Sequence, residues 1–553
     1  MTPAASTSTR TAPLDHTRTG ARLSTPTARS VALAALSLGT LADALFRDGF
    51  GGPAFALWIA LLAASLVSLH REDGGRLPRE VAVWLTVAVA LAASLIWRNS
   101  PALIFLDIVG ALGCLSLAAM RLRNPRAGIF AERVSEVVTA AIRLAFDTAM
   151  GWIPGTVRAV FARESSPAWS GRAKPIIRAK PIIRAVLLTL VVFLAFGALL
   201  RSADPIFASF ASLPDVDVEN LAQHGFIIAV FTVIAGGWAR SALLPPPRDG
   251  YHVPELGFSL APLDIVMILA TLDVLFVAFV GAQLGWLFGG EAFLRARTGL
   301  TAAEYARRGV FQVLWVVVLV VPIVIATRGA ARAEPRLARR HTLLAVPMLA
   351  LLGVMIVSAL ARLRLYVGYY GLTIDRFYAA VVMAWLFVTL VWLYLTVLRD
   401  WVRPFAAGTV AAGMVALFSL NAIDPDAIVA RVNVARTSRD ASRSLDLEHL
   451  ATLRGGAVPY AVREIARAAA DPARLSDSTS ANDLCTAARV VLDRYGSTRG
   501  NYYASRADLD ASWRFWNADD VRAMAAVRDE FRTLLAARHS ACAAQRTRPA
   551  VAR

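Results

Sequence analysis

Long apolar runs, separated by short polar segments, make up most of the chain before residue 421. Each run has roughly the 20 residues that an α-helix needs to cross the hydrocarbon of a bilayer. The runs lie at 31–46, 53–69, 81–97, 101–120, 182–200, 226–244, 262–288, 309–327, 342–360, 378–398 and 404–420. The pattern predicts an all-α, polytopic membrane protein with about eleven transmembrane helices.

The run at 262–288 is the longest, and we expect it to be central to the membrane domain. Asp273 lies near its middle, and Gln283 lies further along. The run ends at Gly289-Gly290, where we predict a break in the helix. The basic segment that follows is expected to lie along the membrane surface.

Polar segments flank this membrane domain of residues 31–420. Residues 1–30 are rich in Thr, Ser, Pro and Arg and predict a disordered tail. Residues 421–553 are charged and rich in alanine, and they predict a small all-α domain. Its helices are expected at 425–437, 446–453, 459–470, 482–494 and 517–537. Trp513, Phe515 and Trp516 are expected in its core.

Charge sets the predicted orientation. The chain is 57% hydrophobic and carries a net charge of +18, almost entirely from arginine between the apolar runs. This placement favours anionic lipid head groups as partners rather than nucleic acid. The basic segment 121–181 predicts a cytoplasmic loop, which puts the N-terminus inside and the C-terminal domain outside. The scarcity of lysine suggests a bacterial protein, and hence the bacterial cytoplasmic membrane. The arginines at 289–308 and 361–377, which should be outside, run against this topology.

Acidic residues inside apolar runs are the main candidates for chemistry. Asp107, Asp264 and Asp273 lie in predicted membrane helices, and Gln283 is a polar neighbour. An ionised carboxylate in the bilayer is costly, so each should face the bundle interior, be protonated or have a partner. Asp273 either binds a proton or cation in a transport cycle or joins helices by a hydrogen bond.

Other polar residues have simpler interpretations. Asp43 and Asp48 flank the first outer turn and are typical of helix ends near the interface. The aromatic loop at 366–378, with Arg376, is typical of an interfacial belt, and a ligand-binding rim is the alternative. No metal-binding, phosphate-binding or nucleophile motif occurs, so we predict no cofactor and no metal.

A short repeat predicts helix starts. Gly-Leu-Thr occurs at 299–301 and again at 371–373, each time before an apolar run. Thr301 with Glu304 has the spacing of a capping box, in which the two side chains bond free backbone N–H groups. Thr373 is the corresponding N-cap, but Arg376 replaces the acid.

The three cysteines have different settings. Cys114 lies in an apolar run and is expected to be a small core residue. Cys485 and Cys542 are the two cysteines of the C-terminal domain. If that domain lies outside, in an oxidising compartment, we expect a disulfide between them, with unpaired thiols as the alternative.

Several stretches resemble a family of membrane proteins. They are ADALF at 42–46, RSADPIF at 201–207, LDVLFVAF at 272–279, GLTAAEYARRG at 299–309, YGLTIDRFY at 370–378 and LNAIDPDAIVARVN at 420–433. The chain is similar to a bacterial polytopic family, the domain of unknown function numbered forty-one fifty-three or forty-one seventy-three. The resemblance implies a membrane location and supplies no catalytic residue.

These observations favour a non-enzymatic membrane protein with a sensory, regulatory or envelope-organising role. An ion-coupled secondary transporter that uses Asp273 is the first alternative. A glycosyltransferase acting on lipid-linked sugars is a weaker one, suggested by the acids of the first outer turn and by the outer domain.

Overall fold

The structure is a computed structural model, and it describes residues 25–72, 74–123, 144, 148, 218–243, 261–298, 310–401, 404–439, 444–496 and 513–546. Within these ranges every regular element is an α-helix or a short 3-10 helix, which confirms the all-α class. The predicted span 182–200, most of the basic segment 121–181 and the caps Thr301 and Glu304 lie outside the described residues.

The described residues fall into two compact units. The smaller unit contains α1 (Thr25–Phe46) and α9 (Val218–Leu243). The contacts between these helices include two pairs of side chains: the Asp43 carboxylate lies 2.7 Å from Nδ1 of His224, and the Phe46 ring stacks on Phe231 at 5.2 Å. Helix α1 begins at Thr25, so residues 25–30 of the predicted disordered tail are helical, and residues 1–24 lie outside the described part.

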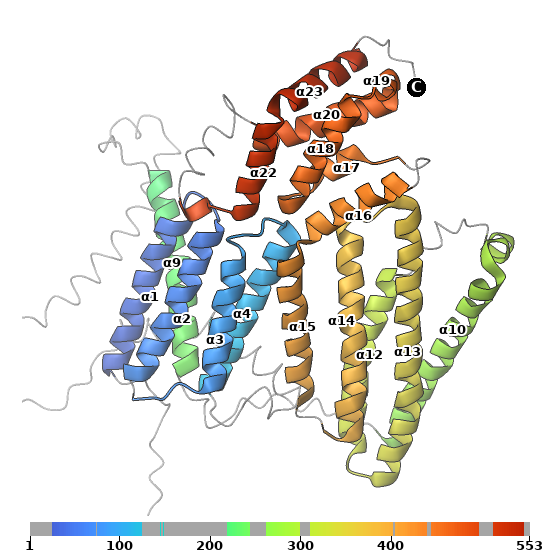
Figure 1. Cartoon of the computed structure of the whole chain (residues 1–553). Coiled ribbons are helices and arrows are strands. Elements are labelled where there is room, and N and C mark those ends of the chain that lie inside the picture. Colours follow the sequence, from blue (N-terminus) through green and yellow to red (C-terminus); the bar gives the residue numbers. More distant parts are fainter. Residues whose placement is uncertain are drawn as a thin grey trace, which may run out of the picture. The chain divides into compact units, whose positions relative to one another are not determined.

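The larger unit contains the remaining helices of the membrane domain, and Figure 1 labels the α-helices among them. They are α2 (Gly52–Glu72), α3 (Arg79–Ser94), α4 (Pro101–Arg123), α10 (Pro262–Thr298), α12 (Val310–Ala331), α13 (Pro335–Tyr370), α14 (Ile374–Thr396), the 3-10 helix η2 (Val397–Arg399) and α15 (Pro404–Ile423). Helix α13 is central to one bundle, because Met348, Leu352 and Ile356 are fully buried in a core shared with α10, α12 and α14.

Nine helices in the described part of the chain are long and apolar enough to cross a membrane. They are α1, α2, α4, α9, α10, α12, α13, α14 and α15. The multi-pass membrane architecture is therefore confirmed. Helix α3 has only 16 residues, and the predicted span 81–97 ends early, at Ser94.

The predicted break at Gly289-Gly290 is wrong. Helix α10 runs without interruption from Pro262 to Thr298. Glycine in a helix costs only about 1 kcal/mol relative to alanine. Continuing the helix also keeps the backbone N–H and C=O groups at these positions hydrogen-bonded within α10.

The C-terminal helices form a second apolar core. They are α16 (Pro425–Arg439), α17 (Leu447–Thr452), η3 (Gly455–Ala457), α18 (Val458–Ala469), α19 (Pro472–Ser476), α20 (Ser478–Tyr495), η4 (Trp513–Phe515), α22 (Ala518–Asp529) and α23 (Phe531–Arg546). Leu450, Ile465 and Leu534 are among its fully buried residues. The predicted helix 517–537 is two helices, separated at Glu530.

Cys485 and Cys542 form a disulfide that ties α20 to α23, with Cα atoms 5.1 Å apart. The expectation that the three C-terminal aromatic residues belong to the core is wrong. Trp513 and Trp516 are about half exposed, and η4 has no buried residue. This short element instead packs beside the start of α2, where Gly51 leaves no room for a side chain against the Arg514 carbonyl.

Helix α16 lies across the ends of α13, α14 and α15 (Figure 1). The Asn433 side chain fixes it there by bonding both backbone groups of Leu372, each at 2.7 Å. Arg436 adds a hydrogen bond to the Tyr369 carbonyl at 3.0 Å. The YGLTIDRFY and LNAIDPDAIVARVN stretches, far apart in sequence, therefore contact each other directly.

Candidate functional site at the junction of the membrane and C-terminal helices

Arg98 is the centre of a buried polar junction. It lies in the turn between α3 and α4, and its side chain is only 11% exposed. Its guanidinium donates to the Asn421 carbonyl at 2.6 Å and to the Asp424 carboxylate at 2.9 Å, and it lies 3.5 Å from the Asp519 carboxylate. One arginine thus joins a membrane turn to the end of α15 and to α22.

Asp424 occupies the corner between α15 and α16. Its carboxylate accepts a hydrogen bond from the Ala427 N–H at 3.2 Å, as an N-cap does, and Pro425 takes the first helical position. Its φ of 56° is in the left-handed region, which costs energy in a residue other than glycine. The contacts to Arg98 and to the α16 N-terminus offset this cost, so the IDPD sequence specifies a rigid corner.

Two glycines bring the backbone of η3 against the same carboxylates. Gly456 donates its N–H to Asp424 at 3.2 Å, and Gly455 has φ of +55°. A Cβ atom at Gly456 would lie 2.3 Å from Asp424 Oδ2, and one at Gly455 would lie 2.7 Å from Asp519 Oδ2. Any side chain at these positions would push η3 away from the junction.

The start of α22 closes the site. The Asn517 side chain caps the helix and also donates to the Leu95 and Arg98 carbonyls at 2.9 and 3.0 Å, while the Ala518 N–H donates to Ile96. Asp519 follows and is 1% exposed. Burial and the nearby Asp424 raise the pKa of Asp519 to about 6, although Arg98 and Arg522 oppose this rise.

Asp107 extends the polar junction into the membrane helices. This residue of α4 is fully buried. Its carboxylate accepts hydrogen bonds from Ser94 Oγ at 2.7 Å and from Asn421 Nδ2 at 2.8 Å. Because Asn421 also accepts from Arg98 through its backbone, it links the membrane carboxylate to the charged junction.

Asp426, Ser100 and Tyr378 form the other side of the junction. Asp426 is 4% exposed, and one of its oxygens accepts from the Arg454 N–H at 3.1 Å. Burial raises the pKa of Asp426 above its usual range. The Ser100 hydroxyl lies within hydrogen-bonding reach of both Asp426 and Tyr378.

The other predicted site residues lie elsewhere. Asp273 is half-buried on α10, and its Oδ1 atom has no hydrogen-bond partner among the described residues. Asp264 is exposed at the start of α10, where it accepts from the Ala261 N–H at 2.9 Å. Gln283 lies in the same helix, and its side chain is outside the described part. The structure thus brings neither Asp264 nor Asp273 to Asp107.

Thr373 occupies the N-cap position that was predicted for it. Thr373 precedes α14 as predicted, but its hydroxyl makes no capping hydrogen bond. The chain before α14 is held instead by the bonds from Asn433 to Leu372. In the aromatic loop, Arg376 lies over the Tyr366 ring at 4.3 Å, and Tyr369 and Tyr370 are exposed.

Sequence reasoning missed Arg98, Asp424 and Asp519. Asp424 and Asp426 belong to the IDPD sequence at 423–426, in which two acids flank a proline. This local pattern could have identified both residues. No such pattern exists for Arg98 or Asp519. The two residues are 421 positions apart, and nothing in the sequence around either one indicates that it is buried.

A second charged cluster lies at the opposite end of the larger unit. Arg328 of α12 is 4% exposed and pairs with Asp400 at 2.7 Å. Nearby, Nε2 of the fully buried His341 lies 2.9 Å from the Thr327 hydroxyl. These contacts fix α12, α13 and η2 relative to one another.

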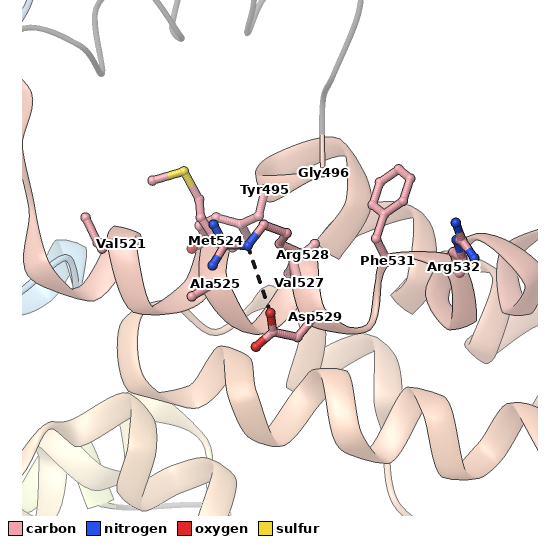
Figure 2. Close-up of a pocket in the computed structure, with 10 residues that line it drawn as sticks. All are labelled: Tyr495, Gly496, Val521, Met524, Ala525, Val527, Arg528, Asp529, Phe531 and Arg532. Atoms are coloured by element: carbon pink, nitrogen blue, oxygen red, sulfur yellow. Dashed lines mark ion pairs between the residues drawn. The ribbon is translucent and has the colours of Figure 1, made fainter.

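The C-terminal helices also have an open pocket of about 670 Å³ (Figure 2). It is lined by Tyr495, Gly496, Val521, Met524, Ala525, Val527, Arg528, Asp529, Phe531 and Arg532. Arg528 and Asp529 lie 3.9 Å apart and are 81% and 74% exposed. Charged groups so well solvated orient a ligand weakly, so the buried junction is the stronger candidate site.

The fold and the site define a polytopic helical membrane protein whose C-terminal helices are joined to its membrane helices through buried charges. The chain belongs to the family described as Domain of unknown function (DUF4153), whose model matches residues 85–464. No curated protein and no solved structure matches the chain. The match covers Arg98, Asp107, Asp424 and Asp426, whereas Asp519 lies beyond it.

Proposed function

We propose that this protein is a sensory or regulatory membrane protein, in which the junction around Arg98 couples the C-terminal helices to the membrane helices. One observation carries the proposal: a single buried arginine contacts α15, Asp424 and Asp519 at once. Buried ion pairs contribute little net stability but impose one specific arrangement. A buried ion-pair arrangement of this kind is better suited to transmitting a structural change between the two sets of helices than to anchoring one set on the other.

The test of this function is whether a change in the C-terminal helices reaches the membrane helices. The full chain in lipid nanodiscs would be compared with and without its disulfide, with backbone amide exchange as the readout. We expect reduction to speed exchange at Ile104 and Asp424, whose N–H groups bond the Ser100 and Leu420 carbonyls. The Arg98→Gln variant should lose this response, because the connection through the guanidinium is broken. Unchanged exchange at both amides in the wild type would overturn the proposal.

We further propose the bacterial cytoplasmic membrane as the location, with the N-terminus inside and the C-terminal helices outside. The arginine-rich residues 121–184 support a cytoplasmic loop. The Cys485–Cys542 disulfide supports an oxidising compartment for the C-terminal helices. Reporter fusions within 121–184 and after Ala550 should respond in opposite ways. A cytoplasmic reporter that is active after Ala550 would reverse the orientation.

A further inference from the structure

Two apolar grooves flank helix α14, which contacts both α13 and α15 (Figure 1). The groove beside α13 has a volume of about 540 Å³, and the groove beside α15 has a volume of about 500 Å³. Phe387 and Val391 line both grooves. These two residues are four positions apart on one face of α14, so they form the ridge that separates the grooves. Cavities of this size are typical of sites for small molecules.

Both grooves lie among membrane helices, because α13, α14 and α15 are each long and apolar enough to cross a bilayer. Along α13 the first groove extends from Val346 to Val357. This part of the helix is about 16 Å long, close to the roughly 15 Å of hydrocarbon in one leaflet. Among the described lining residues, only Tyr394 and Trp392 have a polar side-chain group, and the Trp392 N–H already bonds the Pro404 carbonyl at 3.3 Å. The lining therefore favours a hydrocarbon chain as the occupant.

Two glycines keep the grooves open. Gly353 of α13 lines the first groove, and Gly408 of α15 lines the second. A Cβ atom at Gly353 would lie 3.4 Å from the Phe387 ring, so a longer side chain there would extend into the groove. A Cβ atom at Gly408 would overlap the Trp392 indole. The missing side chains leave space that a hydrocarbon chain can fill.

Both grooves reach the same end of α14, and a free arginine lies there. Tyr394 lines the first groove and Leu395 the second, in the last turn of the helix, and η2 follows with Arg399. The Arg399 guanidinium carbon lies 5.1 Å from the centre of the Tyr394 ring, and the side chain is exposed. The neighbouring Asp400 carboxylate pairs with Arg328 at 2.7 Å, and no described residue forms an ion pair with Arg399.

Further positive charge surrounds this end of the helices. Arg332 lies 3.4 Å from Asp400, which places the turn between α12 and α13 beside η2. This turn and the start of α13 carry exposed arginines at 332, 336, 339 and 340, and Glu334 is the one acid between residues 331 and 342. Clusters of arginine at the end of membrane helices attract anionic lipid head groups.

We propose that the two grooves and Arg399 form a binding site for an anionic phospholipid. The two acyl chains lie on either side of the ridge formed by Phe387 and Val391, and Arg399 binds the phosphate. A ligand with two hydrocarbon chains and one anionic head group matches two apolar grooves that end at one arginine. The bound lipid would hold α13, α14 and α15 together. This site is separate from the junction around Arg98 and does not depend on the proposed function.

The test uses the full chain in nanodiscs of phosphatidylcholine and two photoreactive probes, a phosphatidylglycerol and a phosphatidylcholine that carry the same diazirine in one acyl chain. Mass spectrometry of the digested protein locates the cross-links. The anionic probe should label the groove-lining peptides about 5-fold more than the uncharged probe, the effect of about one arginine near an anionic head group. Excess unlabelled phosphatidylglycerol should displace it. Equal labelling by the two probes would overturn the site, because it would indicate ordinary contact with the bilayer.

Val391→Trp and Val382→Trp are a matched pair of variants. Both valines belong to α14 and have similar exposure, 44% and 40%, but Val382 lines neither groove. Tryptophan at position 391 takes up space in both grooves, so labelling should fall about 10-fold, as when about two methylene groups of the ligand are no longer buried. Val382→Trp should leave labelling unchanged. Equal effects of the two variants would contradict the proposed position of the acyl chains.

Arg399→Gln tests the head-group contact. It should lower labelling by the anionic probe about 5-fold and leave the uncharged probe unaffected, which a general loss of structure would not do. Arg463→Gln is the control, because Arg463 is also exposed and lies 4.9 Å from a tyrosine ring, but in the C-terminal helices. Labelling unchanged by Arg399→Gln would overturn the assignment of the phosphate.

A photoreactive benzoylphenylalanine in place of Val354, which lines the first groove, identifies the occupant directly. It should cross-link to phospholipid. A cross-link to protein, either a second copy of the chain or another segment of the same chain, would show that protein covers the groove and would overturn the lipid site.

Discussion

Replacing Arg98 with glutamine is the sharpest test of the junction. The change removes the positive charge that contacts Asp424 at 2.9 Å and Asp519 at 3.5 Å, while both carboxylates stay buried. Removing one partner of a buried ion pair costs about 3–5 kcal/mol, because the remaining charge is left uncompensated. We therefore expect the free energy of docking to fall by about this amount near pH 7.5.

Hydrogen exchange of backbone amides, measured on the protein in nanodiscs, reports the loss of docking free energy at the junction itself. The Ala518 N–H, bonded to Ile96, should lose protection on the order of 10²- to 10³-fold, since each 1.4 kcal/mol is a factor of 10. Amides in the middle of α13 should change little. The effect should be smaller at pH 5, because protonation of Asp519 removes part of the uncompensated charge.

Arg522→Gln is the matched control for this prediction. Arg522 also pairs with Asp519, but its side chain is 58% exposed, so its loss should cost no more than about 1 kcal/mol. Adding Asp519→Asn to Arg98→Gln should restore part of the exchange protection of the Ala518 amide, because it removes one of the two uncompensated buried charges. Equal, small effects of the two arginine variants would show that the junction does not hold the C-terminal helices.

Three further predictions test other parts of the chain. Because the folded-state pKa of Asp519 is about 6 against an ordinary 3.8, the folded protein binds more protons between these values, and stability should fall as pH rises from about 4 to 6. Asp519→Asn should flatten this slope in chemical unfolding; an unchanged slope would contradict the assignment. The double variant Cys485→Ala with Cys542→Ala should lower the stability of the C-terminal helices by about 4 kcal/mol, because it opens a loop of 57 residues. Cys114→Ala is the control: Cys114 is a free cysteine, so its loss opens no loop and should not cause this decrease. If Asp273 titrates in a transport cycle, Asp273→Asn should abolish ion flux in proteoliposomes but leave the protein folded; flux equal to that of protein-free vesicles in the wild type would argue against transport.

Local patterns in the sequence determined the helices. Apolar runs long enough to cross a bilayer give nearly the observed bounds, as for α4 and α15, because hydrocarbon leaves the backbone few alternatives to a helix. The Asp424-Pro425 pair marked the start of α16, because an N-cap followed by proline is a local signal. The break predicted in α10 failed because each glycine costs a helix only about 1 kcal/mol relative to alanine, and the helix continues through both.

The disulfide could be predicted from the sequence only in part. Its partners were predictable because the C-terminal segment has only two cysteines. Its geometry, with Cα atoms 5.1 Å apart, depends on how α20 packs against α23. No periodicity in either helix specifies that packing.

Only the tertiary structure decided the site. Asp107 was recognised as a candidate because a carboxylate in an apolar run is conspicuous, but its partners come from α3 and α15. Arg98 and Asp519 look in sequence like ordinary surface charges. Their burial arises from the docking of α22 on the α3–α4 turn, a contact between segments separated by 421 positions. Whether a charge is solvated or buried depends on what packs over it, and a linear pattern of apolar and polar residues does not record that.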